Sequence, residues 1–210
     1  VLRNTKAWQD SLKLHSYKVN ADSYLQMIDG MIYGEDPKQG YTMDNTFYHP
    51  ELRFKFSFPL GWQLTNAPTQ VTVQPSDGKA LMLFTLSGQK TLQSAVDTTM
   101  AMYGLQLQRS EKKTVNGLQA IATLSKQQVQ DQSTGTTGAN AVISYFVQYG
   151  SMIYVFHGVS TEADFAGYAP TMEASMKTFA QLTDQSRINV KPKRVFVRKA
   201  PKTGTLASTL

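Results

Sequence analysis

A strict alternation of apolar and polar residues, ending at a proline–glycine turn, constrains this chain more than any other feature. From residue 46 to residue 64 the sequence reads TFYHPELRFKFSFPLGWQL, with large apolar residues at every second position of its middle part: Leu52, Phe54, Phe56 and Phe58. A period of two is typical of a strand that buries one face in a core. Pro59 and Gly61 end the run, because proline cannot donate to a strand ladder and glycine accepts turn geometry. The stretch predicts a hairpin-like corner rich in aromatic residues, after which Trp62 and Leu64 resume the alternation.

Length and composition predict an ordinary globular chain. With 210 residues, 41% hydrophobic and 17% charged, the sequence suits one large domain or one domain with extensions. It has no cysteine, which excludes disulfides, thiolate catalysis and cysteine-ligated metal sites. No apolar run approaches the ~20 residues that cross a bilayer, so no transmembrane segment is expected. The chain starts at Val1 and not at methionine, and we expect a processed or excised piece of a longer protein.

The net charge of +6 is concentrated at the C-terminal end. Residues 187–210 hold 7 of the 21 Lys and Arg residues and no acid, which leaves 14 bases against 15 acids in residues 1–186. Such a tail can contact phosphates or anionic lipid. Two interpretations stay open, a solvated and partly extended terminus or a tail that binds nucleic acid or an anionic surface. We expect the first, and therefore no nucleic-acid partner.

Three segments have apolar residues at helical spacing. The first runs from about Ala21 to Tyr33, before the turn-forming residues 34–40. The second opens at Thr91 and ends at Gly104. The third covers residues 165–179, where Pro170 predicts a bend or a division into two helices, since proline disrupts a helix interior.

Strand-like runs fill most of the remaining sequence. They cover residues 70–73, 80–86, 107–115, 118–129, 141–147 and 152–159. Residues 141–147 are apolar on both faces, which indicates a central strand. The polar residues 131–140 predict a mobile hairpin tip, and residues 187–199 predict a short strand or an extended arm. Hairpins with helices between them predict the α+β class, with an antiparallel sheet of about six or seven strands flanked by helices.

No set of residues in the sequence has the types and spacing of a known catalytic site. His15, His49 and His157 are far apart and lack the spacing of a zinc site, so we expect structural or surface roles. There is no serine-nucleophile elbow and no phosphate-binding glycine pattern, and the GTTG sequence at residues 135–138 is expected to be loop. The acid pairs Glu35–Asp36 and Glu162/Asp164 suit turns and helix starts. We therefore assign no catalytic, cofactor-binding or metal-binding residue, and no enzyme activity, to this chain.

The aromatic residues allow one alternative function. A stacking platform for single-stranded nucleic acid would place basic side chains and aromatic rings on the same face of the protein. Here the basic residues alternate with the rings, so core packing is the favoured interpretation for this set: Phe54, Phe56, Phe58, Trp62, Tyr145, Tyr149 and Tyr154.

Two stretches resemble bacterial HtpX/BepA-type zinc metallopeptidases, in the part that follows the catalytic domain. Residues 24–62 carry the first resemblance, through IDGM at 28–31, GEDP at 34–37, QG at 39–40, and the run from Phe47-x-His49-Pro50 to FPLGW at 58–62. The end, RINVKPKRVFVRKAPKTGTLASTL, is similar to the C-terminal stretch of that family, with Gly204 to Ala207 matching the start of a LysM-like piece that Leu210 truncates.

This resemblance implies a non-catalytic accessory domain, because the His-Glu-x-x-His helix of the family has no counterpart in this sequence. The implied role is to bind a partner, position substrate or regulate the protease, in the periplasm or at the bacterial cell envelope. The implied partners are its own protease domain or envelope proteins. Zinc is expected only in the missing catalytic domain, and no cofactor in this chain.

The FPLGW corner, with a sheet and flanking helices, is also similar to PsbP-like domains. That resemblance implies an α+β sandwich and the following organisation: a connector and helix at 1–45, a PsbP-like domain at 46–183, and a basic arm at 184–210. The alternative function is a free-standing PsbP-like periplasmic protein that binds a hydrophobic or protein ligand.

Overall fold

The protein is represented by a computed structural model, which describes residues 6–7, 10–11, 20–34, 36–130 and 137–198. The chain divides into two compact units, one made of Val1–Asp36 and Lys191–Leu210 and the other of Pro37–Val190. Among the described residues, no helix has the length and apolar character needed to span a membrane. The matched residues Gly204 to Ala207 of the LysM-like piece lie outside the described part.

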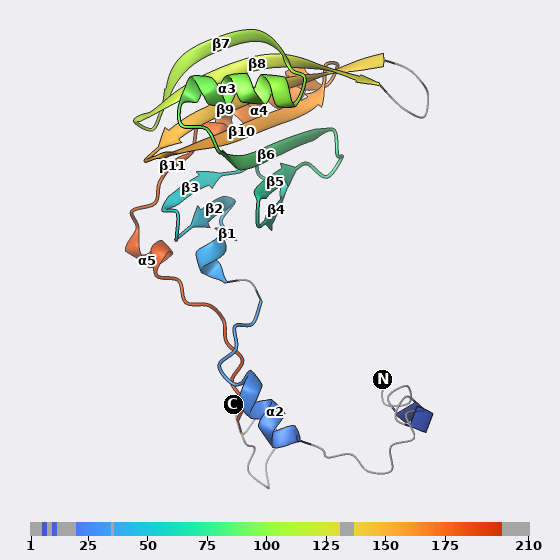
Figure 1. The fold of residues 1–210 in the computed structure, drawn as a ribbon, viewed down its shortest axis with the longest axis vertical. Coiled ribbons are helices and arrows are strands. Elements are labelled where there is room, and N and C mark those ends of the chain that lie inside the picture. Colours follow the sequence, from blue (N-terminus) through green and yellow to red (C-terminus); the bar gives the residue numbers. More distant parts are fainter. Residues whose placement is uncertain (1–5, 8–9, 12–19, 35, 131–136, 199–210) are drawn as a thin grey trace. The chain divides into compact units, whose positions relative to one another are not determined.

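A seven-stranded antiparallel sheet forms the centre of the second unit (Figure 1). Its strands lie in the order β4 (Gln63–Ala67), β5 (Gln70–Gln74), β6 (Ala80–Ser87), β10 (Met152–Thr161), β9 (Thr137–Tyr149), β8 (Leu118–Gln130) and β7 (Gln106–Val115). The predicted fold class and number of strands are confirmed. β9 lies between β8 and β10, as its two apolar faces predicted.

A second sheet of four short strands was not predicted. Its order is β1 (Tyr41–Met43), β2 (Thr46–His49), β3 (Phe54–Ser57) and β11 (Ala180–Gln181), and the 3-10 helix η1 (Pro37–Gln39) precedes it. The period-two prediction is confirmed, since Phe54 and Phe56 are buried. The hairpin prediction is wrong, because β3 pairs with β2 and β11 whereas β4 pairs with β5. Residues 58–62 therefore carry the chain from the small sheet to the large one.

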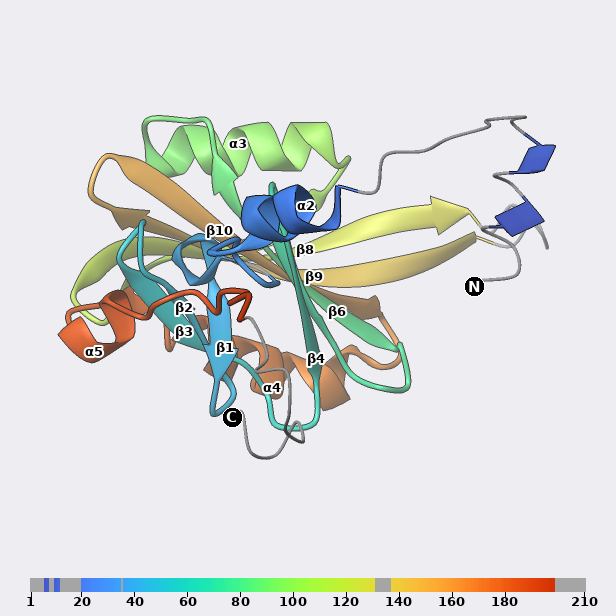
Figure 2. The same cartoon turned by 90° about the horizontal axis from the view of Figure 1, so that it is seen from below.

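The two faces of the large sheet are covered by different elements (Figure 2). The helix α3 (Leu92–Met102) packs on one face, where Ala95 and Val96 meet Val155 of β10. The helix α4 (Phe165–Met176) and the small sheet pack on the other face, against Tyr154 and Phe156 of the same strand. Successive strand residues point to opposite faces, so one central strand supplies both cores.

Local signals explain how α3 begins. The Thr91 hydroxyl oxygen accepts a hydrogen bond from the Ser94 backbone N–H at 3.1 Å, which satisfies a free donor of the first turn. The predicted start at Thr91 is confirmed. The helix ends next to Gly104, whose φ of 59° suits glycine.

The helix α4 does not divide at Pro170. Proline removes the N–H that would bond the carbonyl of Ala166, four residues earlier. Both Ala166 and Pro170 are exposed, so water can take the place of the missing N–H donor. Of the two expected outcomes, a bend or a division into two helices, the division is wrong, because the helix runs on through Pro170 on its solvent side.

Two other boundaries differ from the prediction. Thr137 to Asn140 were expected in a hairpin tip but pair with Gln127 to Gln130, which extends the β8–β9 hairpin; residues 131–136 lie outside the described part. Residues 185–188 form the short helix α5 (Gln185–Ile188), so the segment expected as a strand or extended arm begins in a helix.

In the first unit, the helix α2 (Ala21–Ile28) ends five residues earlier than the expected Tyr33. The reason is a competing backbone pairing with residues 193–195. The N–H of Gly30 donates to the carbonyl of Val195 at 2.8 Å, and the N–H of Tyr33 donates to the carbonyl of Lys193 at 2.8 Å. The predicted extended conformation of this part of the arm is thus realised against the residues that follow α2.

Close packing at Gly158 of β10 generates the first prediction. A Cβ at this position would lie 2.9 Å from Met172 Sδ, 2.9 Å from Met176 Cε and 3.0 Å from Ile143 Cγ2. We expect Gly158→Ala to lower the free energy of unfolding by about 1–3 kcal/mol, because the side chains of Met172, Met176 and Ile143 must shift to make room for the Cβ. Urea denaturation measures this change.

The matched control is Gly167→Ala in α4. No heavy atom lies within 4 Å of a Cβ built there, and alanine favours a helix over glycine by about 0.5–1 kcal/mol. We expect the control to be more stable than the original protein. Equal stability of the two variants would contradict a close contact at Gly158.

Candidate functional site

An open groove of about 700 Å³ lies between the 58–62 corner and α4. It is lined from the corner side by Ser57, Phe58, Pro59, Leu60 and Trp62, and from the helix side by Pro170, Thr171, Ala174, Ser175 and Thr178. Leu60 is 86% exposed, the most of any large apolar residue among those described. The sequence identified the corner but not its neighbour, because α4 follows more than a hundred residues later.

Hydrogen bonds to the backbone of β3 hold one end of the groove. The Ser175 hydroxyl donates to the Ser57 carbonyl at 2.6 Å. The Ser57 N–H donates to the Thr178 hydroxyl oxygen at 2.7 Å, and that hydroxyl donates in turn to the Ser175 carbonyl at 2.6 Å. The last turn of α4 is therefore fixed to the strand that leads into the corner.

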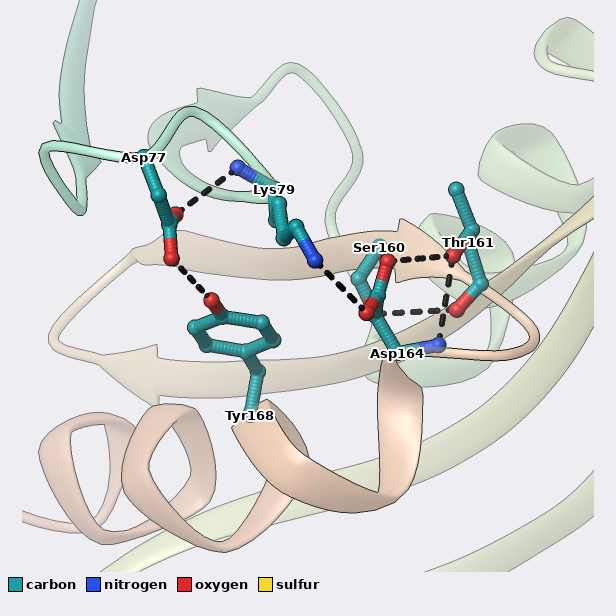
Figure 3. A network of polar contacts seen from close by, with 6 residues as sticks. All are labelled: Asp77, Lys79, Ser160, Thr161, Asp164 and Tyr168. Carbon is teal, nitrogen blue, oxygen red and sulfur yellow. Dashed lines mark hydrogen bonds and ion pairs between the residues drawn. The ribbon is translucent and has the colours of Figure 1, made fainter.

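Side-chain contacts join the Trp62 end of the groove to the β5–β6 turn and to the start of α4, and Figure 3 shows the polar contacts between that turn and the helix. The Trp62 ring meets the Tyr168 ring edge to face, with centroids 6.0 Å apart. The Tyr168 hydroxyl donates to Asp77 in the β5–β6 turn, a bond that holds the pKa of this carboxyl below its usual range. Lys79 in the same turn lies 3.5 Å from Asp164 at the start of α4. The corner, the turn and the helix are thus linked by polar and ring contacts.

The two described histidines lie in different sheets, His49 in β2 and His157 in β10, and do not form a site together. His49 accepts a hydrogen bond at Nδ1 from the Leu52 N–H at 3.2 Å, and its partial burial lowers its pKa. His157 lies on the α3 face of β10, where its Nδ1 is 2.8 Å from the hydroxyl oxygen of Ser144. Burial lowers the pKa of His157 to about 4, so this ring is neutral at pH 7. His15 lies outside the described residues.

The acidic candidates Glu162 and Asp164 each contact a different partner. Glu162 is paired with Lys126 at 2.5 Å, and Asp164 accepts a hydrogen bond from the Thr161 hydroxyl at 3.0 Å. Glu35 lies outside the described part. Within the described ranges, no group of three or more His, Asp or Glu side chains is placed to hold a metal ion. The loop expected at 135–138 is wrong for Thr137 and Gly138, which belong to β9, and residues 135–136 lie outside the described part.

The aromatic residues form the core and not a stacking platform, as the favoured interpretation predicted. The fully buried members of the set are Phe54, Phe56, Tyr145 and Tyr154, and Phe58, Trp62 and Tyr149 are partly buried against them. These rings are covered by the small sheet and α4, so bases cannot stack on the buried ones.

Comparison with known proteins supports the fold. No protein-family model and no curated protein matches the sequence. The solution structure of cyanobacterial PsbP (CyanoP) from Synechocystis sp. PCC 6803 matches with a TM-score of 0.51 over 65% of this chain and 91% of that chain, at 12% identity. The chain has a PsbP-like α+β fold.

Two further structures match less well. The Ran-binding protein Mog1p from Saccharomyces cerevisiae has a TM-score of 0.44 at 11% identity, over 70% of this chain and 99% of that chain. LpqN, involved in cell envelope biogenesis of Mycobacterium tuberculosis, has a TM-score of 0.42 at 11% identity, over 79% of this chain and 98% of that chain. These two matches do not indicate a function, and none of the three structures supports the resemblance to HtpX/BepA-type peptidases.

The burial of His157 predicts a loss of stability in weak acid. Its pKa is about 4 in the folded protein and about 6.5 in the unfolded chain. Between these values only the unfolded chain takes up the proton, so the free energy of unfolding falls as the pH falls from about 6.5 to about 4, by about 3 kcal/mol in total. Urea denaturation across this range measures the slope.

His157→Leu should flatten this slope. His49→Gln is the matched control and should remove a smaller part, because His49 is less buried and its pKa is lowered less. Identical slopes for the original protein and His157→Leu would contradict a neutral, buried His157.

Two buried tyrosines give a further prediction. The Tyr145 hydroxyl donates to Glu173 Oε1 at 2.6 Å, whereas the Tyr154 hydroxyl has no hydrogen-bond partner among the described residues. Tyr145→Phe should lower the free energy of unfolding by about 1–2 kcal/mol, because a bond to a charged group is lost. Tyr154→Phe should leave it unchanged or raise it by up to about 1 kcal/mol, since an unpaired polar group leaves the core. Thermal denaturation of both variants checks the contrast, and equal losses would contradict it.

Proposed function

We propose that this chain is a non-catalytic accessory domain of a zinc-dependent HtpX/BepA-type peptidase of the bacterial envelope. In this proposal the domain binds a protein segment and thereby positions substrate or regulates the protease. The parent's catalytic domain, outside this chain, would bind the zinc, and the whole protein would be periplasmic or associated with the envelope.

The sequence supports the proposal through residues 24–62, which resemble the segment that follows the catalytic domain in these peptidases. The resemblance ends at the FPLGW corner, and the corner forms one wall of the groove. The residues that carry the resemblance therefore include those that present the exposed Leu60.

The observation that carries the proposal is the exposed Leu60 beside a groove with fixed walls. Leu60 and Trp62 provide an apolar rim, and Pro170 and Ala174 provide the facing helix surface. The volume of about 700 Å³ suits several side chains of one peptide segment. Because both ends of the groove are held by hydrogen bonds and ring contacts, binding requires little ordering of the walls. We take the occupant to be a segment of the parent's own peptidase domain with apolar side chains.

Leu60→Asp tests the groove. The side chain is exposed, so the folded domain should keep its stability, while a charge on the rim should weaken binding to the separately expressed catalytic domain by about tenfold or more. Ala174→Arg should have the same effect by filling the groove from α4. Isothermal titration calorimetry measures both affinities.

Met102→Asp is the matched control, since Met102 is also apolar and exposed but lies at the end of α3, on the other face of the sheet. The Met102→Asp variant should bind the catalytic domain with the affinity of the original protein. If Leu60→Asp and Ala174→Arg also bind normally, the groove is not the binding site.

The second candidate is a free-standing PsbP-like periplasmic protein that uses the same groove for a hydrophobic or protein ligand. The PsbP-like fold is compatible with either candidate. The reading frame upstream of Val1 and the intact mass of the native protein separate them. A His-Glu-x-x-His helix encoded upstream is the outcome expected from the peptidase proposal, whereas a signal sequence directly before Val1 would replace it with the second candidate.

A further inference from the structure

A small pocket opens beside His157, at the end of α3. Its lining comes from four strands of the large sheet and from the residues just after the helix: Leu81, Leu83, Tyr103, Leu105, Gln127, Val142, His157 and Val159. It forms on the α3 face, because His157 lies two residues from Val155 of the α3 core. The helix ends at Met102 and leaves this part of the sheet uncovered.

The size of the pocket limits what it can hold. Its volume is about 110 Å³, and an apolar cavity of about 150 Å³ accepts benzene, so the pocket suits a group of roughly five or six heavy atoms. Five of the lining side chains are leucine or valine. Leu81 and Tyr103 are also exposed at the surface, so a ligand can enter from solvent.

The hydrogen bonding of Ser144 determines which atom of His157 carries the proton. Ser144 is 0% exposed and its side chain has no hydrogen bond in the described structure other than the contact with His157 Nδ1. Thr123 lies directly opposite Ser144 on β8, but its hydroxyl has no partner and does not accept the proton. His157 Nδ1 is the one acceptor that the described structure places within hydrogen-bond distance of the Ser144 hydroxyl, and we therefore infer that Ser144 donates to Nδ1 and that the neutral ring carries its own proton on Nε2.

The Nε2–H group belongs to the most buried polar residue that lines the pocket, since the other two, Gln127 and Tyr103, are more exposed. His157 is 6% exposed, and no hydrogen bond joins Nε2 to any described residue. A donor in an apolar pocket selects a hydrogen-bond acceptor on the ligand. No lysine or arginine lines the pocket, so a carboxylate would be buried without an opposite charge. A carbonyl oxygen meets these conditions.

We propose that this pocket binds a small neutral apolar group that carries one carbonyl oxygen, held by a hydrogen bond from His157 Nε2. The inference goes beyond the proposed function and is independent of it. The pocket lies on the α3 face of the sheet and the groove lies beside α4, so the failure of one leaves the other unaffected.

Nuclear magnetic resonance with two matched probes tests the proposal. Cyclopentanone should shift the methyl signals of Leu83, Val142 and Val159 and the Nε2 signal of His157, with a Kd on the order of millimolar. Cyclopentane, which lacks the acceptor, should shift the methyl signals alone and bind about threefold to tenfold more weakly. The tautomer of His157 in the free protein is read from its two ring nitrogen signals and should be the Nε2–H form.

Leu105→Trp should block the pocket and abolish these shifts. Leu107→Trp is the matched control, because Leu107 lies two residues further on, is exposed and does not line the pocket. Absence of methyl shifts in the original protein, or unchanged binding in Leu105→Trp, would overturn the site. Equal affinity for the two probes, or an Nδ1–H tautomer, would overturn the role of His157. The last two measurements use the original protein, so they decide the role of His157 even if a variant fails to fold.

Discussion

Ring packing between the two sheets is the interaction on which the rest of the second unit depends. The Phe54 ring of the small sheet has its centroid 5.1 Å from that of Tyr154, 5.2 Å from that of Phe84 and 5.5 Å from that of Phe179. Four strands of two to four residues cannot form a stable sheet in water without a second layer to cover one face. The aromatic layer provides that cover, and it requires the 58–62 corner to pass the chain from one sheet to the other.

The two faces of the large sheet have different chemistry because their covering elements differ. The face under α4 and the small sheet is filled with large rings and methionines. The face under α3 meets the small residues Ala95, Val96 and Thr99, and it keeps polar groups such as Ser144 and His157. The helix α3 ends at Met102 and covers only part of this face, and the pocket beside His157 lies just beyond that end.

The helix α4 takes part in both the core and the groove through its own periodicity. Met172 and Met176 point into the core and close on Gly158, whereas Pro170 and Ala174 face the groove. Residues four apart lie on one side of a helix, so a single helix can serve the two roles. The stability of the core and the shape of the groove are therefore linked, because the same helix supplies side chains to both.

Local patterns in the sequence determined the α+β class, most strand positions and the start of α3, because hydrophobic period, turn residues and caps act over a few residues. The alternation of Leu52 to Phe58 predicted a half-buried strand, and the strands expected at 107–115 and 118–129 correspond to β7 and β8, which pair with each other. Pairing partners were decided only by the tertiary structure. The alternation does not specify which strand pairs with β3. It therefore does not distinguish a hairpin from a passage between two sheets, and it does not predict the small sheet. The length of α2 was decided by backbone bonds to residues 193–195, far away in the chain. The groove and the pocket were missed for the same reason, since each joins side chains from segments whose meeting depends on how the sheets and helices stack.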